Sequence, residues 1–226
     1  NAASIIPLID KPVVTYGIES DDVDFKAINI AHQDGTISFE LVYKDRSYPF
    51  EMSVPGSYNI LNALAAISVC KTMGLKIEDI SSSLKSFSGV NRRFDVKIHS
   101  EDLTIIDDYA HHPVEVSSVI KAVKDNWDRR LLVVFQPHLF SRTKQFFKEF
   151  ALSLSDADVI FITEIFASRE KLDNSINSEI ITTYLQKLNH KNTLNITTDT
   201  LLDEVKKYYE KGDIIQIKSP ILELKK

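Results

Sequence analysis

A seven-residue stretch at positions 107–113 concentrates the side chains most able to bind an anion or move a proton. It reads Asp-Asp-Tyr-Ala-His-His-Pro and contains Asp108, Tyr109 and His111. Carboxylates, imidazoles and a phenol are costly to bury and are not needed for packing. An apolar run precedes the stretch and an amphipathic helical pattern follows it, which predicts a turn from a strand into a helix. Open α/β sheets bind their ligands at such turns.

Pro113 suits the first turn of this predicted helix, because its missing N–H group costs nothing there. The helix would then direct its positive N-terminal end at a ligand beside the histidines. The alternative interpretation is a polar turn that caps a helix. Because His111 and His112 are adjacent, their side chains diverge on a helix, and we do not expect a two-histidine metal site.

A second polar cluster follows the apolar run 131–135 and opens the next predicted helix. It contains His138, Ser141 and Arg142, with Ser141 as the candidate N-cap residue. If the two strands are neighbours in a parallel sheet, a right-handed crossover brings the two turns side by side. His111, His138 and Arg142 would then surround one anionic group, since arginine suits bidentate contact with phosphate or carboxylate. An exposed arginine at a helix start is the alternative.

Two further segments carry weaker signals. Arg92 and Arg93 follow a small, polar stretch, and paired arginines beside a flexible boundary can hold a nucleotide between domains, although they are more often solvated charge. Asn59 and Asn62 lie one helical turn apart and share a face. Their amides can read an adenine edge as donor and acceptor, while a cap plus a surface asparagine is the simpler interpretation.

The composition and the absence of common motifs exclude several classes of function. A net charge of −5 with scattered Lys and Arg argues against nucleic acid as the main partner. There is no apolar run of membrane-spanning length, no signal-like start, no phosphate loop, no G-x-G-x-x-G, no zinc-type spacing and no G-x-S-x-G. The one cysteine, Cys70, excludes a disulfide framework. We therefore expect a cytoplasmic location without a membrane or nucleic-acid partner.

The elements that must position these residues follow two patterns. Residues 13–54 are predicted to form short strands, the first at 13–18, with turns at Asp34-Gly35 and at 44–47. This pattern is typical of the antiparallel edge of a sheet. Helices are predicted at 60–73 and 77–87, and the small, polar stretch 88–91 is the best domain boundary. The chain starts Asn-Ala-Ala-Ser without methionine, so we expect a fragment of a longer protein.

From residue 94 onward, strands and helices alternate. Strands are predicted at 94–99, 103–106, 131–135, 159–162, 194–197 and 214–217. Helices are predicted after Pro113, after Ser141, at 179–188 and at 201–209. This alternation predicts an α/β fold with a mostly parallel, doubly wound sheet of five or six strands.

Several segments, in their order along the chain, resemble the Mur ligases, which are ATP-dependent amide-forming enzymes of peptidoglycan synthesis. They are Asn59-x-x-Asn62-Ala63-x-Ala65-Ala66, Gly89-Val90-x-Arg92-Arg93-Phe94, the stretches 107–115 and 135–143, and the late segment 165–170. The two histidine-bearing stretches are most similar to the family member that joins L-alanine to UDP-N-acetylmuramate. Three features depart from the family pattern. Tyr58 stands where a histidine is usual, Leu139 stands where many relatives have a basic residue, and the C-terminal segment 212–219 lacks the usual glycine-rich ending.

The resemblance implies a Rossmann-like C-terminal domain at 89–226, preceded at 1–88 by the C-terminal portion of the central ATP-binding domain. In such ligases ATP phosphorylates the carboxylate of UDP-N-acetylmuramate, and the amine of L-alanine attacks the acyl phosphate. ATP and Mg²⁺ are the implied cofactors. The phosphate loop and the magnesium ligands would lie mostly in N-terminal domains outside this chain, so no metal ligand is assigned here and the fragment alone is expected to be inactive.

The same resemblance implies roles for individual residues. Asn59 and Asn62 would hold adenine, and Arg93 with Asp108 would hold the ribose and phosphates. The reacting carboxyl, alanine and phosphoryl groups would face four side chains: Tyr109, His111, His138 and Arg142. No general base is assigned, although His111 is the best candidate because an imidazole titrates near the working pH. Another Mur ligase, a folylpolyglutamate synthase relative and a non-catalytic α/β binding module are the alternatives.

Overall fold

The computed structural model describes residues 2–218 of the 226-residue chain. Two features of the sequence, the Asn1 start and Ser219 in the atypical C-terminal segment, lie outside the described residues. The chain divides into two compact units, Asn1–Ser88 and Gly89–Lys226, and each is taken by itself.

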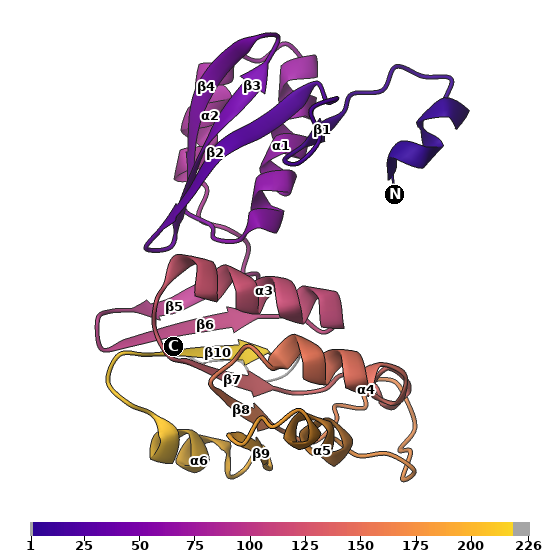
Figure 1. Ribbon diagram of the computed structural model, residues 1–226, viewed down its shortest axis with the longest axis vertical. Coiled ribbons are helices and arrows are strands. Elements are labelled where there is room, and N and C mark those ends of the chain that lie inside the picture. The colour runs from indigo at the N-terminus through magenta and orange to yellow at the C-terminus, as the bar shows by residue number, and fades with distance from the viewer. Residues whose placement is uncertain (1, 219–226) are drawn as a thin grey trace. The chain divides into compact units, whose positions relative to one another are not determined.

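The first unit is a four-stranded sheet with two helices over one face (Figure 1). Its elements are η1 (Ala2–Leu8), β1 (Tyr16–Gly17), β2 (Phe25–Gln33), β3 (Thr36–Tyr43), β4 (Arg46–Met52), α1 (Ser57–Thr72) and α2 (Ile77–Ser86). The strand order is β1-β2-β3-β4, with β2, β3 and β4 antiparallel. The core between the sheet and the helices is built from Phe39, Leu41, Ile60, Leu64 and Ile67, all at most 2% exposed.

The strand predicted at 13–18 is mostly wrong. Only Tyr16 and Gly17 pair with β2, and they do so in parallel rather than antiparallel fashion. Val13 and Val14 are 38% and 42% exposed, so no core holds them in a sheet. The hairpin turns are confirmed: Asp34 and Gly35 have φ values of 45° and 81°, as a tight hairpin turn requires.

Gly56, the residue before α1, adopts a backbone that only glycine reaches easily. Its φ is +103°, and a Cβ atom there would lie 2.6 Å from Cε1 of Tyr58. We expect Gly56→Ala to lower the free energy of unfolding by about 2 kcal/mol, through backbone strain and displacement of the Tyr58 ring. Urea unfolding of the chain measures this loss.

Gly74→Ala is the matched control. Gly74, just after α1, has a φ of +91° but nothing within 4 Å of the added Cβ. It should therefore show the strain of a positive φ alone, about 1 kcal/mol. Equal losses for the two variants would show that the Tyr58 ring yields freely.

The second unit is a six-stranded sheet in the order β5-β6-β10-β7-β8-β9. Its elements are β5 (Asp95–His99), β6 (Leu103–Asp108), α3 (Pro113–Asn126), β7 (Leu131–Phe135), α4 (Phe140–Leu154), β8 (Val159–Ile162), α5 (Glu179–Lys187), β9 (Thr193–Asn195), α6 (Leu201–Tyr208) and β10 (Asp213–Lys218). All neighbouring strands are parallel except β5, which forms an antiparallel hairpin with β6. The predicted mostly parallel α/β sheet is confirmed.

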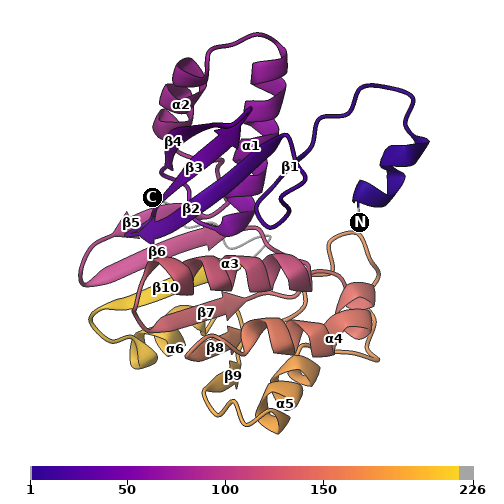
Figure 2. The ribbon, with the colours of Figure 1, turned by 45° about the horizontal axis from the view of Figure 1, so that its top comes forward.

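The sheet is covered on both faces. Figure 2 shows α3 and α4 side by side over one face, where Phe135 of β7 meets Phe150 of α4 at a ring distance of 5.1 Å. Phe161 of β8 points to the other face and meets Tyr208 of α6 at 5.6 Å. Right-handed crossovers explain this division, because the chain moves outward from β7 to β9 and then reverses to reach β10.

The predicted adjacency of β6 and β7 is wrong. β10 lies between them, and each of its last residues is paired on both sides. Lys218, for example, pairs with Asp108 of β6 and with Phe135 of β7. The last strand of a doubly wound sheet can fill an interior gap that no local sequence pattern reveals. The loops after β6 and β7 must therefore meet across the end of β10.

Candidate functional site

The turn after β6 is anchored to the segment just before β5. The N–H group of Tyr109 donates to the Arg92 carbonyl at 2.9 Å, and the Arg92 guanidinium lies 5.3 Å from the centre of the Tyr109 ring. Arg92 Nε also lies 3.3 Å from Oδ2 of the buried Asp107. Burial raises the pKa of Asp107, and Arg92 opposes that rise. Arg92 thus fixes one side of the Tyr109 ring from within the same unit.

Asp108 has a different place from the one expected for a ribose or phosphate ligand. It is 2% exposed, and its two oxygens accept from the N–H groups of Phe94 and Ala110, each at 2.7 Å. A carboxylate engaged in this way ties the turn after β6 to the segment just before β5. We therefore treat Asp108 as a residue that shapes the turn.

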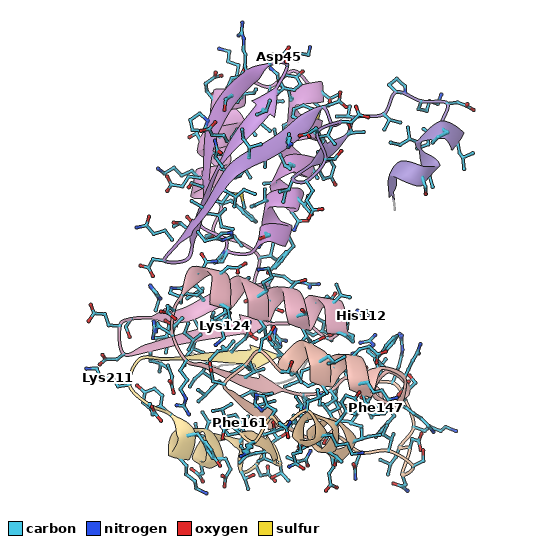
Figure 3. All side chains as sticks on the ribbon, in the orientation of Figure 1. Asp45, His112, Lys124, Phe147, Phe161 and Lys211 are labelled. Atoms are coloured by element: carbon cyan, nitrogen blue, oxygen red, sulfur yellow. The ribbon has the colours of Figure 1, made fainter. Side chains whose placement is uncertain are left out.

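Glu115 and His112 begin α3 as a reciprocal cap. The Glu115 carboxylate accepts from the N–H groups of His111 and His112 at 3.0 and 3.1 Å, while Nδ1 of His112 accepts from Val114. These hydrogen bonds, with the charges of His111 and Arg93, outweigh burial and lower the pKa of Glu115. Pro113 is the first helical residue, as predicted. Figure 3 shows His112 at this end of α3.

The two adjacent histidines diverge, as expected. The His112 ring packs edge-on against Phe146 of α4 at 5.4 Å, whereas His111 lies between Tyr109 at 5.1 Å and His138 at 5.7 Å. Nδ1 of His111 lies 2.9 Å from the carbonyl of Tyr109. A carbonyl only accepts, so Nδ1 carries the proton and Nε2 of neutral His111 is left as an acceptor.

The turn after β7 has a strained backbone. Leu139 precedes α4 with a φ of +73° and a ψ of 133°, which is rare for any residue other than glycine. Its N–H group donates to Phe166, and its carbonyl accepts from both the N–H and the hydroxyl of Thr143. The predicted N-cap, Ser141, is wrong, because α4 already begins at Phe140 and Ser141 donates to Glu170 instead.

The two turns meet at Arg142. Its Nη1 donates to the carbonyl of His111 at 3.3 Å and also lies 3.3 Å from Nδ1 of His138. Arginine has no acceptor, so Nδ1 of His138 must accept and the proton of its neutral ring sits on Nε2. His111, His138 and Arg142 therefore converge as predicted, with α4 supplying the link.

His138 is held in its neutral form. Burial, the Arg142 guanidinium and His111 lower its pKa, with Glu170 opposing them. Its ring stacks on Phe166 at 5.6 Å. With both rings neutral, the pair presents one ring N–H, from His138, and one ring acceptor, on His111. Such a pair, beside an arginine, can bind an anion while accepting a proton nearby.

The two asparagines of the first unit form a pair of their own. Nδ2 of Asn59 donates to the Pro55 carbonyl at 2.6 Å, and Nδ2 of Asn62 donates to Oδ1 of Asn59 at 3.2 Å. Both line a pocket of about 480 Å³ between α1 and α2, which Ala63 and Phe87 also border. A pocket of this size and apolar character is typical of small-molecule sites.

The described residues contain neither a cluster of metal ligands nor a helix suited to crossing a membrane. Within residues 2–218, no three His, Cys, Asp or Glu side chains gather in a way that would hold a metal ion. No helix in the same range has the length and apolar character that crossing a membrane requires.

Comparisons with known proteins identify the family of the chain. The sequence model described as "Mur ligase, glutamate ligase domain" matches residues 92–220, and the model described as "Mur ligase middle domain" matches residues 3–70. The first match alone covers more than half of the chain. The chain belongs to the Mur ligase family.

Individual relatives of the chain within the Mur ligase family are named as alanine ligases. The chain is 37% identical over 217 residues to UDP-N-acetylmuramate--L-alanine ligase of Geotalea daltonii, covering 95% of this chain and 47% of the relative. It is also 37% identical over 220 residues to the Clostridium tetani protein of that name, covering 96% and 48%. The chain thus spans about half the length of the curated relatives it matches.

Solved Mur ligases share the fold. UDP-N-acetylmuramate-alanine ligase of Thermotoga maritima matches with a TM-score of 0.75 and 24% identity, over 91% of this chain and 44% of that one. The MurF ligase of the same organism, solved in complex with ADP, matches with a TM-score of 0.68 and 20% identity, over 91% and 44%.

Two residues of the site carried no predicted role. Phe166 supports His138, and its only signal was its position in the Mur ligase-like segment 165–170. Lys218 ends β10 beside Asp108, and its signal was a lysine directly after the apolar strand 214–217. Neither sequence feature predicts what Phe166 or Lys218 contacts, because those contacts depend on the strand order of the sheet.

Proposed function

We propose that this chain is the C-terminal part of an ATP-dependent ligase that joins L-alanine to UDP-N-acetylmuramate through an acyl phosphate. The observation that carries the proposal is the convergence of His111, His138 and Arg142 at the ends of β6 and β7. The names of the relatives support the same reaction. The reaction would take place in the cytoplasm.

We assign residues 1–88 to the C-terminal portion of the central ATP-binding domain and 89–226 to the Mur ligase C-terminal domain. The N-terminal domains of the same protein would then cover α1. Leu61, Val69 and Met73 of this segment are 40%, 58% and 74% exposed, while Ile60 and Leu64 are fully buried on its other side. A helix that is apolar all round is typical of one covered on both faces.

Each unit, taken by itself, has residues suited to binding part of a nucleotide. Asn59 and Asn62 keep donor N–H groups, and Asn62 keeps its Oδ1 acceptor, after the hydrogen bonds they make. This set can read an adenine edge. Arg93 is exposed and suits the ribose and phosphates, whereas the buried Asp108 would contribute by shaping the turn.

The reacting groups would lie against Tyr109, His111, His138 and Arg142. Arg142 and the Nε2–H of His138 would bind the anionic oxygens of the acyl phosphate. The free Nε2 of His111 would accept a proton from the attacking amine. Tyr109, held between Arg92 and His111, would close one side of the site. Positioning and charge stabilisation supply most of the rate in phosphoryl chemistry.

The described residues do not fit magnesium. The carboxylates nearest the histidines already bind Arg92 or backbone N–H groups. The family's Mg²⁺ ligands would therefore lie in the N-terminal domains.

The test is an assay of the full-length protein with ATP, Mg²⁺, UDP-N-acetylmuramate and a panel of amino acids. Alanine-dependent release of phosphate is the expected result, with no turnover by the 226-residue chain alone. Turnover with glutamate or a peptide, and none with alanine, would instead identify another Mur ligase or a folylpolyglutamate synthase relative. No turnover with any amino acid would favour a non-catalytic binding module.

A further inference from the structure

Lys218 lies between the last residues of β6 and β7, where the two turns of the site begin. It is the last residue of β10, and it pairs with Asp108 on one side and Phe135 on the other. Its carbonyl accepts from the N–H group of Gln136 at 2.9 Å, so its backbone also holds the start of the turn after β7. The backbone of Lys218 therefore contacts the first residues of both turns.

The side chain of Lys218 is fully buried, with 0% exposure. Its Nζ makes no hydrogen bond within the described part of the chain. A buried ammonium group is costly unless charges offset it. Two carboxylates act on it, Asp108 of β6 and Glu115 of α3, while β7 places the uncharged Phe135 beside it.

Those two carboxylates are the ones that hold the turn after β6. Asp108 binds the N–H groups of Phe94 and Ala110, and Glu115 binds those of His111 and His112. Their four hydrogen bonds hold the backbone that follows Tyr109, at residues 110–112, and the N–H group of Phe94 just before β5. A positive charge at Lys218 attracts both carboxylates, since each raises the pKa of the Lys218 ammonium group against the effect of its burial.

We propose that Lys218 is a positioning residue of the ligase site, whose buried ammonium group is the shared counter-charge of Asp108 and Glu115 and thereby holds Tyr109 and His111 in place. The proposal rests on the proposed function for its catalytic consequence. It does not rest on that function for the charge coupling itself.

The first test measures this coupling in the 226-residue chain without any substitution. The pH titration of Lys218 is followed by NMR at its Nζ, together with the backbone amide signals of Ala110, His111 and His112. We expect the amide signals to shift with the same midpoint as Lys218, near pH 8. Amide signals that ignore the ionisation of Lys218 would overturn the proposal whether or not the protein is a ligase.

The second test is catalytic and uses the full-length protein. We expect Lys218→Met to lower kcat for alanine ligation about 100-fold with little change in KM for ATP, and Lys218→Arg to recover part of the loss. Gln216→Met is the matched control. Like Lys218, Gln216 is fully buried and lies on the same face of β10, and its side-chain amide has no hydrogen-bond partner within residues 2–218. Unlike Lys218, it has no carboxylate as its pairing partner in β6 or β7.

The results distinguish a failure of the positioning role of Lys218 from a failure of the proposed ligase function. A Lys218→Met enzyme within twofold of wild type, or a Gln216→Met enzyme equally impaired, would overturn the positioning role. Absence of ligase activity in the wild-type protein would reject the proposed function and leave the NMR result to decide the coupling. If Lys218→Met does not fold, the titration of the unmodified chain still decides.

Discussion

Replacing Arg142 by methionine in the full-length protein is expected to lower kcat/KM for alanine ligation about 10³-fold, the scale of losing a main contact to transition-state charge. Arg142 joins the two turns, because its Nη1 binds the His111 carbonyl and Nδ1 of His138. Its loss removes a cation from the proposed anion site and also releases the His138 ring and the His111 carbonyl. Steady-state kinetics with varied alanine and ATP measure the effect.

Arg142→Lys should recover about tenfold of that loss, because it restores charge without the planar, two-point contact. Lys144→Met is the control. Lys144 lies on the same helix, but it is exposed and pairs with Asp173 at 4.0 Å, away from the histidines. Equal kinetics for the Arg142→Met and wild-type enzymes would remove Arg142 from the proposed site.

The same substitution has a consequence that needs no substrate. Arg142 helps to lower the pKa of His138, so the Met variant should show a higher His138 pKa in the NMR titration of the 226-residue chain. An unchanged His138 titration would mean that burial and His111 hold this imidazole neutral without Arg142.

Replacing Lys218 by methionine is expected to stabilise the chain by about 3 kcal/mol at pH 7. Burial lowers the pKa of Lys218 from 10.5 to about 8, although Asp108 and Glu115 raise it. At about 1.4 kcal/mol for each pH unit, this difference is the cost of keeping the ammonium group buried. Methionine fills a similar volume without that cost. The expected gain, set against the expected loss of activity, separates a positioning role from a structural one.

The stability gain should depend on pH. Between about pH 8 and 10.5 the unfolded chain binds a proton at Lys218 that the folded chain has released, so wild-type stability rises across this window. Below about pH 8 both states are protonated and the full cost is present. The difference between variant and wild type should therefore shrink as pH rises from 8 to 10.5. Urea unfolding of both proteins at pH 7, 9 and 10.5 measures it.

A constant difference across that pH range would mean that Lys218 does not change its charge on folding. A less stable Lys218→Met chain at pH 7 would mean that the carboxylates gain more from the cation than its burial costs. Comparing the two proteins at each pH cancels the titration of all other groups.

Much of the fold followed from local pattern. The Asp34-Gly35 hairpin, the strand 159–162 and the helix starting at Pro113 lie where they were predicted. Each depends on neighbours in sequence: a turn residue at positive φ, a run of apolar residues or a proline at a helix start. Val13 and Val14 failed as a strand because pairing, which is not local, decides whether an apolar run joins a sheet.

The candidate site was predicted in part. His111, His138 and Arg142 do converge, but the sequence supplied the wrong reason for it, since β6 and β7 are not neighbours. The role of Asp108 also depends on its surroundings. Its type suggested a ligand, and only the backbone N–H groups packed around it show that it shapes the turn.

By itself, the sequence determined the alternation of strands and helices, the two histidine-bearing turns and the Mur ligase resemblance, because these depend on residue type and short spacing. Only the tertiary structure decided that β10 enters between β6 and β7 and buries Lys218 beneath the turns. Strand order is set by packing between segments more than 100 residues apart, as Lys218 and Asp108 are. Local chemistry therefore shows which groups are available, and the sheet decides which of them meet.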